Sequence, residues 1–113
     1  MLADQKILVG TVTWQFDPKF DTAFDESDLA LLPPVTRHDF LKHAYFDHSL
    51  KKFVMCFDNQ RFINHSDTPN IISTPQRDMA GRDIEPGEEM TCDYAQYEHD
   101  WFERRNLRRE DFV

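Results

Sequence analysis

At 113 residues, the chain is long enough for one hydrophobic core and short for two. Its aromatic content of 13% is above what a disordered chain carries. The net charge of −8 argues against a nucleic-acid-binding surface, which needs a basic stripe. An acidic surface has two other roles: it attracts basic peptides, and it keeps a protein soluble.

The first predicted element is a strand over residues 11–16, because apolar and polar residues alternate there with a period of two. One face of this strand carries Val12, Trp14 and Phe16. A short helix over residues 28–32 follows, with Ser27 in the capping position and a proline pair at its end.

A second short helix is predicted after the proline pair. Thr36 followed by Asp39 resembles a capping box, which marks a helix start. An apolar stripe follows on one helical face: Phe40, Leu41 and Ala44. Tyr45 lies on the same stripe, and we expect it to contribute to the core.

Short strands dominate the rest of the chain. We expect them over residues 52–57, 70–73 and 90–94, with Asp58-Asn59 as the turn after the first. Glu85-Pro86-Gly87-Glu88 has Pro and Gly at the two central positions, which is the chemistry of a type II turn. Residues 97–113 are predicted to form a peripheral helix or tail, anchored by Trp101, Phe102 and Leu107. The pattern predicts one mainly β domain, residues 1–113, with short helices.

The chain shows no stretch of the roughly 20 apolar residues that a membrane span requires. Its N-terminus has no basic region followed by an apolar run, so no signal peptide is visible. Cys56 and Cys92 lie in apolar or strand-like runs, which favours buried, reduced thiols in a cytoplasmic protein. The absence of C-x-x-C and the scatter of the five histidines predict no metal site.

Two segments carry chemistry. The first reads Arg61-Phe62-Ile63-Asn64-His65-Ser66-Asp67-Thr68-Pro69-Asn70, and the second reads Ile84-Glu85-Pro86-Gly87-Glu88-Glu89-Met90-Thr91-Cys92-Asp93-Tyr94. Taken alone, the first is a glycosylation sequon without a secretory route, or a turn whose polar side chains bond the nearby backbone. The second, taken alone, ends in a buried tyrosine bonded to the backbone.

In this order and separation, the two segments together resemble the paired signature of SET-domain lysine methyltransferases. That family places an Asn-His-Ser-x-x-Pro-Asn loop beside a Gly-Glu-x-x-x-x-Asp-Tyr strand. The resemblance covers roughly residues 2–101 and points to the small, bacterial- or viral-type members. It implies a β-clip of several small sheets with a C-terminal pseudoknot. It also implies transfer of a methyl group from S-adenosylmethionine to a lysine of a protein substrate.

Carried over residue by residue, the resemblance makes Asn64 and His65 cofactor contacts, with Arg61 beside the same pocket. Tyr94 becomes the catalytic residue, because a hydroxyl at the end of a narrow channel would bond the lysine amine or the methyl group. Methyl transfer is an in-line displacement, so the protein contributes mainly alignment and electrostatics. The amine must first be neutral, and an apolar channel lowers the pKa of a lysine by desolvation.

Other residues extend this expected site. Tyr45 and Tyr97 are candidates for the walls of the substrate channel. Trp101 has two interpretations: it stacks on the adenine of the cofactor, or it attaches the tail to the core. Asp93 is a structural acceptor or a general base. Asp67 stands where the family often has Cys, which suggests a position tolerant of change.

The chain departs from the family in one respect. It has no Gly-x-Gly, and its three glycines are Gly10, Gly81 and Gly87. In the family, an opening strand with that turn closes over the methionine end of the cofactor. Without it, we expect the strand over residues 11–16 to be a sheet edge that could pair with a second copy of the chain. The alternatives are a truncated enzyme, a homodimer, or a degenerate non-catalytic module for peptide binding or self-association.

Overall fold

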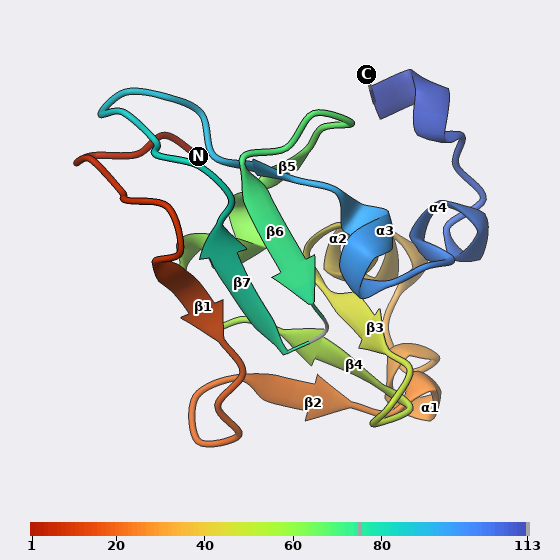
Figure 1. The fold of residues 1–113 in the computed structure, drawn as a ribbon. Helices are drawn as coiled ribbons and strands as arrows, with labels where there is room; N and C mark the ends of the chain where they lie inside the picture. Colours follow the sequence, from red (N-terminus) through yellow and green to blue (C-terminus); the bar gives the residue numbers. More distant parts are fainter. Residues whose placement is uncertain (75, 113) are drawn as a thin grey trace.

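The computed structural model describes residues 1–74 and 76–112, which form three small sheets with short helices along one side (Figure 1). The strands are β1 (Val12–Gln15), β2 (Thr22–Phe24), β3 (Tyr45–Asp47), β4 (Lys52–Met55), β5 (Asn64–His65), β6 (Ile71–Thr74), β7 (Arg77–Ala80) and β8 (Thr91–Cys92). The helices are α1 (Glu26–Leu29), α2 (Pro34–His43), α3 (Tyr94–Tyr97), α4 (Trp101–Arg104) and the 3₁₀ turns η1 (Asn59–Phe62) and η2 (Arg109–Phe112). The predicted fold class, mainly β with short helices, is confirmed. None of the helices among the described residues has the length and apolar character that a membrane span needs.

Two of the sheets are antiparallel, with strand orders β1-β7-β6 and β2-β4-β3. β1 lies at an edge of its sheet, as the sequence predicted, and the register with β7 shifts between Val12 and Trp14. This bulge leaves Val12 45% exposed while Trp14 is 6% exposed, so the two do not share one buried face. Pairing of the β1 edge with a second copy stays a prediction.

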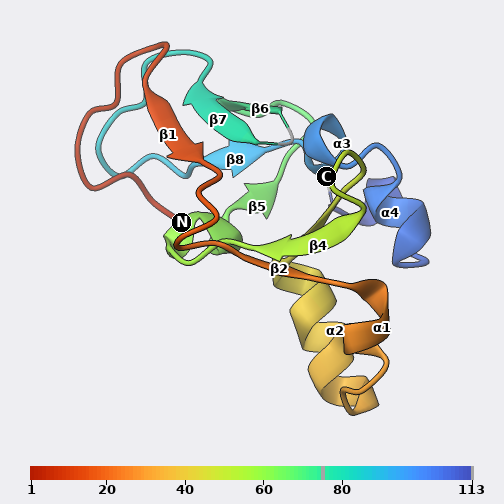
Figure 2. The same ribbon diagram turned by 90° about the horizontal axis from the view of Figure 1, so that it is seen from below.

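The first eleven residues run antiparallel to residues 80–90, which include the first half of the second motif, and the two loops lie side by side (Figure 2). Bridges form between Leu2 and Glu89 and between Ile7 and Ile84. The predicted type II turn is present, because Gly87 has a φ of 84° and the Glu88 amide donates to the Glu85 carbonyl at 3.1 Å. A residue with a side chain would be strained at that φ.

Three apolar clusters form the core. The first lies beneath the two motifs and includes Ile63, Ile71, Ile84, Met90 and Cys92. The second joins β1, β3 and β4 through Trp14, Tyr45, Val54 and Cys56, and the third packs α1 and α2 on Leu29, Phe46 and Phe53. Both cysteines are free and buried, as predicted.

The helices begin elsewhere than the capping patterns predicted. α1 is capped by Asp25 rather than Ser27, and the Asp28 carboxylate accepts from the Asp25 amide at 3.0 Å. α2 begins at Pro34, so Thr36 lies inside the helix rather than at its start. Proline suits a first helical position because its missing N–H would be unpaired there in any case. Figure 2 shows α1 and α2 projecting together from the β2-β4-β3 sheet.

The ends of three predicted elements also differ. α2 stops at His43 and Ala44 has an extended backbone, so Tyr45 begins β3 and does not lie on a helix. The strand predicted over residues 52–57 ends at Met55. Asp58 is not a turn residue, because its carboxylate accepts from the Gln60 amide and caps η1.

The last predicted strand is short as well. It covers Thr91–Cys92 only, because Asp93 caps α3 by accepting from the Ala95 amide at 2.9 Å, and Tyr94 is the first residue of that helix. The predicted C-terminal helix or tail corresponds to α4 and η2, while Val113 lies outside the described residues. Glu98 attaches this segment to β3, since its fully buried carboxylate accepts from the Phe46 amide at 2.7 Å and from the Arg105 guanidinium at 2.8 Å.

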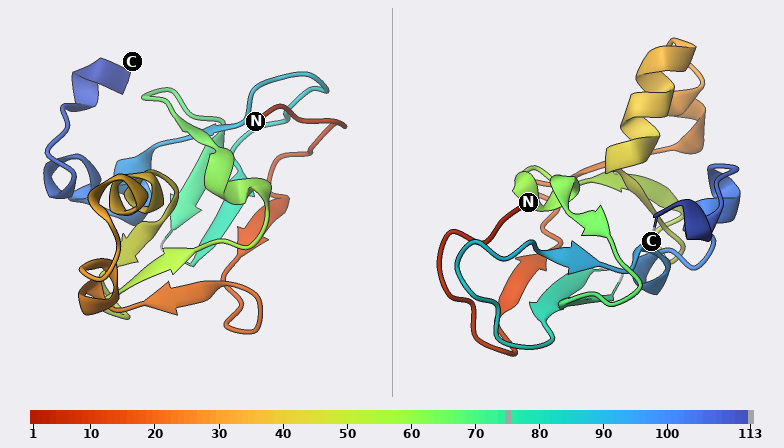
Figure 3. Two further views of the ribbon diagram at one scale, coloured as in Figure 1. Left: turned by 180° about the vertical axis from the view of Figure 1, so that it is seen from behind. Right: turned by 90° about the horizontal axis from the view of Figure 1, so that it is seen from above.

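The two motifs meet in the third sheet, where β5 and β8 pair in parallel (Figure 3, right). Asn64 is opposite Thr91, and His65 is opposite Cys92. The buried side chain of Asn70 joins the same segments, because its amide donates to the Glu89 carbonyl at 2.8 Å and its oxygen accepts from the Thr91 amide at 2.9 Å. This side chain therefore bridges the loop of the first motif and the strand of the second.

Replacing Asn70 with Ala is expected to lower the free energy of unfolding by about 2–3 kcal/mol. The change removes two buried hydrogen bonds and leaves a backbone carbonyl and amide unpaired. Urea unfolding measures the loss. Asn59→Ala, at an exposed position, is the matched control, and equal losses in the two variants would contradict the bridging role of Asn70.

Candidate active site

Tyr94 occupies the point where the two motifs meet. Its hydroxyl donates to the Ile63 carbonyl at 2.7 Å, and its ring lies 4.6 Å from Trp101 and 5.2 Å from His65, measured between centroids. Burial raises the pKa of the Tyr94 phenol well above its usual range. The hydroxyl therefore stays protonated and remains a hydrogen-bond donor at neutral pH.

The imidazole ring of His65 forms a hydrogen bond with the backbone of Tyr94. This side chain is fully buried, and Nδ1 accepts from the Tyr94 amide at 3.2 Å. Because Nδ1 is the acceptor, Nε2 carries the proton and donates to Asp67 Oδ1 at 2.9 Å. Arg109 then contacts Asp67 at 2.8 Å and Asp93 at 2.6 Å. Asp67 is therefore a partner of the motif histidine rather than a tolerant position, and Asp93 is already engaged by Arg109 and the α3 cap.

A wide cavity of about 600 Å³ opens beside this centre. All four of the residues predicted to bind the cofactor line it: Arg61, Asn64, His65 and Trp101. The Asn64 amide donates to the Glu89 carboxylate at 2.8 Å. Arg61 has a clear structural role, because its guanidinium donates to the carbonyls of Phe57 and Asp58 at 2.9 and 2.8 Å. The indole of Trp101 is buried, so it both attaches the C-terminal segment and forms a wall of the cavity.

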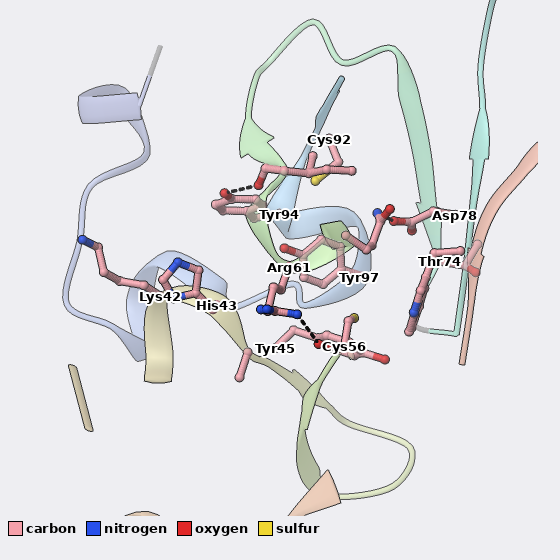
Figure 4. Close-up of a pocket in the computed structure, with 14 residues that line it drawn as sticks. Lys42, His43, Tyr45, Cys56, Arg61, Thr74, Asp78, Cys92, Tyr94 and Tyr97 are labelled. Atoms are coloured by element: carbon pink, nitrogen blue, oxygen red, sulfur yellow. Dashed lines mark hydrogen bonds between the residues drawn. The ribbon is translucent and has the colours of Figure 1, made fainter. Parts of the chain in front are cut away.

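A second, narrow cavity of about 40 Å³ also has Tyr94 in its lining (Figure 4). A cavity of this volume holds only a few water molecules. Tyr45 and Tyr97, the predicted channel residues, both line it, with ring centroids 5.3 Å apart. Trp14, which the sequence placed only in the core, forms a further wall at 6.0 Å from Tyr45, and its buried Nε1 has no hydrogen-bond partner among the described residues.

The two cavities share one wall. Both are lined by Tyr94 and Ile63 from the motifs, by Arg61, and by Lys42 and His43 at the end of α2. The fold thus brings Tyr94 and all of the predicted cofactor-binding and channel residues to one cavity or the other, whereas Asp93 lines neither. Among the lining residues that no local pattern indicated are Lys42 and His43, because only tertiary packing brings the end of α2 to the motifs.

Asp78 is a further lining residue that the sequence did not indicate. It lies in β7, is 5% exposed, and accepts a hydrogen bond from the Gln60 side-chain amide in the wall of the narrow cavity. Burial raises the pKa of this carboxyl from 3.8 to about 7, and the hydrogen bonds that it accepts offset part of that effect. One sequence feature could have indicated that Asp78 is buried. It lies two residues before Ala80 in a segment where buried and more exposed residues alternate, so the two share the buried face.

The described residues include one group that could coordinate a metal ion: His48, His99 and Asp100. Their ligand atoms lie within 4.8 Å of one another, and His48 Nε2 is 2.9 Å from Asp100 Oδ1. The two imidazole rings are exposed, and their centroids lie 4.4 Å apart with the ring planes tilted by 31°. Asp100 also contacts Arg104 at 3.3 Å, which balances its charge without a metal.

The chain belongs to the SET-domain family, since the family model for the SET domain matches residues 1–95. Members of this family are generally protein-lysine methyltransferases. No curated protein matched the chain. The family match spans both motifs and ends one residue after Tyr94.

The buried carboxyl of Asp78 makes stability depend on pH. Its pKa is higher in the folded protein than in the unfolded chain, so the folded state is relatively most stable below pH 4 and loses stability as the pH rises to about 7. The full pKa difference corresponds to a change of about 4 kcal/mol in the free energy of unfolding. Asp78→Asn removes the charge and keeps an acceptor for Gln60. We expect this variant to exceed the natural chain in stability by about 2–4 kcal/mol at pH 8 and to show little difference at pH 4.

Thermal unfolding at both pH values measures this difference. Asp39→Asn, which removes an exposed carboxylate from α2, is the control and should change neither value. A gain for Asp78→Asn that is equal at pH 4 and pH 8 would show that the carboxyl does not titrate between them.

Proposed function

We propose that this protein transfers a methyl group from S-adenosylmethionine to a lysine side chain of a protein substrate. The observation that carries the proposal is the position of Tyr94, which lines both a wide cavity and a small aromatic one. A cofactor in one cavity and a slender side chain in the other would then meet at Tyr94. Membership of the SET-domain family supports the same reaction class.

The residues of the wide cavity fit the cofactor chemically. Its volume of about 600 Å³ is typical of small-molecule sites. Trp101, Phe62 and Leu107 offer apolar surface for a purine, while Lys42 and His43 bring positive or polar groups for a carboxylate. When bound, S-adenosylmethionine supplies a methyl group on a positively charged sulfur. The protein residues hold and orient the cofactor.

The narrow cavity suits the aliphatic stem and amine of lysine. Three phenol rings, those of Tyr45, Tyr94 and Tyr97, surround it, and burial keeps all three protonated by raising their pKa values. Removing water from an ammonium group lowers its pKa and favours the neutral, nucleophilic amine. The partner that we propose is a protein with an accessible lysine in a basic segment, which the net charge of −8 would attract.

Replacing Tyr94 with Phe is expected to reduce turnover by about 10²-fold or more, because the change removes a fixed hydroxyl oxygen that would bond the amine or the methyl group at the reacting centre. Affinity for S-adenosylmethionine should change less than threefold, since the ring that packs on Trp101 is kept. Methyl transfer to a basic peptide library measures turnover, and calorimetry measures cofactor affinity. A fall in affinity as large as the fall in turnover would mean that Tyr94 is a cofactor contact rather than a catalytic residue.

Replacing Asn64 with Ala is expected to act in the opposite way and weaken cofactor binding first, by roughly tenfold, the loss typical of one polar contact. Calorimetry on the natural chain provides the baseline, where we expect micromolar affinity. Thr68→Ala, at an exposed position in the same loop but outside the cavity lining, is the control. A natural chain that gives no heat at millimolar S-adenosylmethionine would favour the non-catalytic module.

A further inference from the structure

Asp78 is held in the wall of the narrow cavity by its neighbours in the sheet. Its Cα lies opposite Trp14 of β1 and opposite Ser73 of β6, and its side chain is buried. Figure 4 shows Asp78 across the cavity from Lys42 and His43, the two residues that also line the wide cavity. The carboxylate therefore lies at the end of the narrow cavity that is remote from the proposed cofactor.

No ion pair joins Asp78 to a cation among the residues that the structure describes. The polar and titratable groups around it come from every neighbouring element and none is positive: Ser73 (β6), Tyr45 (β3), Cys56 (after β4), Asp58 (before η1), Gln60 (η1), Cys92 (β8) and Tyr97 (α3). Arg61 lines the same cavity, but its guanidinium donates to backbone carbonyls.

A buried carboxylate without a cation destabilises a fold, so its presence requires an explanation. Buried charges in proteins are normally paired, and titratable groups in costly positions gather at functional sites. The Asp78 carboxylate and the unpaired Nε1 of Trp14 line the same small cavity. Aromatic rings with an adjacent carboxylate form a suitable environment for an ammonium group, since both attract a positive charge.

We propose that Asp78 is the counter-ion that the ammonium group of the target lysine meets in the channel, and the acceptor of the proton that this lysine must lose. The inference rests on the proposed function and adds a role that the two motifs leave open. In the step, one N–H bond of the ammonium breaks and its electron pair stays on nitrogen, while an O–H bond forms on the carboxylate. A charged pair thereby becomes a neutral amine and a neutral acid.

The low-dielectric channel brings the neutral pair close in free energy to the charged pair, because the neutral pair avoids the cost of two buried charges. The pKa of about 7 that burial imposes on the Asp78 carboxyl also suits an acceptor that works near neutral pH. The phenols of Tyr45 and Tyr97 cannot take the proton, because they are themselves protonated at this pH. When the channel empties, the carboxyl returns the proton to water.

The binding part of the inference is tested with n-butylammonium chloride, which reproduces the end of a lysine side chain. The Asp78 carboxyl is followed by ¹³C NMR as the pH is raised. We expect saturating n-butylammonium to lower the apparent pKa of Asp78 from about 7 to about 6 or below, because a nearby cation favours the charged form. The neutral probe n-butanol should leave the titration unchanged. An Asp78 titration that n-butylammonium does not alter would overturn the inference.

The proton transfer is tested by the pH profile of methylation of poly-L-lysine. Asp78→Asn should be slower than the natural protein by about 10²-fold at pH 7, the usual size of a general-base effect. The deficit should shrink to less than tenfold by about pH 9.5, as more lysine loses its proton in solution. Asp39→Asn is the control. An equal loss at every pH would assign Asp78 a structural role only.

The two proposals fail in different ways. If the natural protein does not bind S-adenosylmethionine in calorimetry, the proposed function is wrong, whatever the n-butylammonium titration shows. If cofactor binding and transfer to poly-L-lysine are present but Asp78→Asn follows the natural pH profile, only the role of Asp78 is wrong.

Discussion

The parallel pairing of β5 with β8 is the contact on which the site depends. Two segments far apart in the sequence become neighbours there, and their polar groups satisfy one another. Asn70 bonds the backbone of the second motif, and the His65 ring accepts the amide of Tyr94. The tautomer of His65 is fixed by Asp67, which Arg109 holds from the C-terminal segment. Strand pairing, the shape of the loop and the position of Tyr94 thus depend on one connected set of hydrogen bonds.

Burial around this set of hydrogen bonds has both a cost and a consequence. Protonated phenols are stable in the narrow cavity, because burying a neutral hydroxyl costs little free energy when it donates to an acceptor. The Tyr94 hydroxyl donates to the Ile63 carbonyl. A carboxylate in the same place destabilises the fold. Burial therefore raises the pKa of Asp78, and the carboxyl stays protonated at acidic pH. The cavity therefore combines a donor that stays protonated with an acid whose charge changes near neutrality. Both properties follow from low exposure, not from any unusual residue.

The two motifs and the turn around Gly87 could be predicted from the sequence, because they depend on local chemistry. Gly87 occupies the position of the type II turn that requires a positive φ. Tyr94 was predicted at the end of a strand, but the Asp93 cap starts a helix there, since a side chain competes with the sheet for the next amides. Asp78 was missed because the strand that contains it, β7, was not predicted. Lys42 and His43 reach the site only through the packing of α2, which no local pattern records.

A crystal structure of the protein with S-adenosylhomocysteine tests the central claim most directly. The account predicts that the purine lies in the wide cavity against Trp101 and the Asn64–His65 strand, with the thioether sulfur facing the Tyr94 ring. Density for the ligand at any other surface, with Tyr94 out of contact with it, would contradict the claim that the two motifs frame a single methyl-transfer centre.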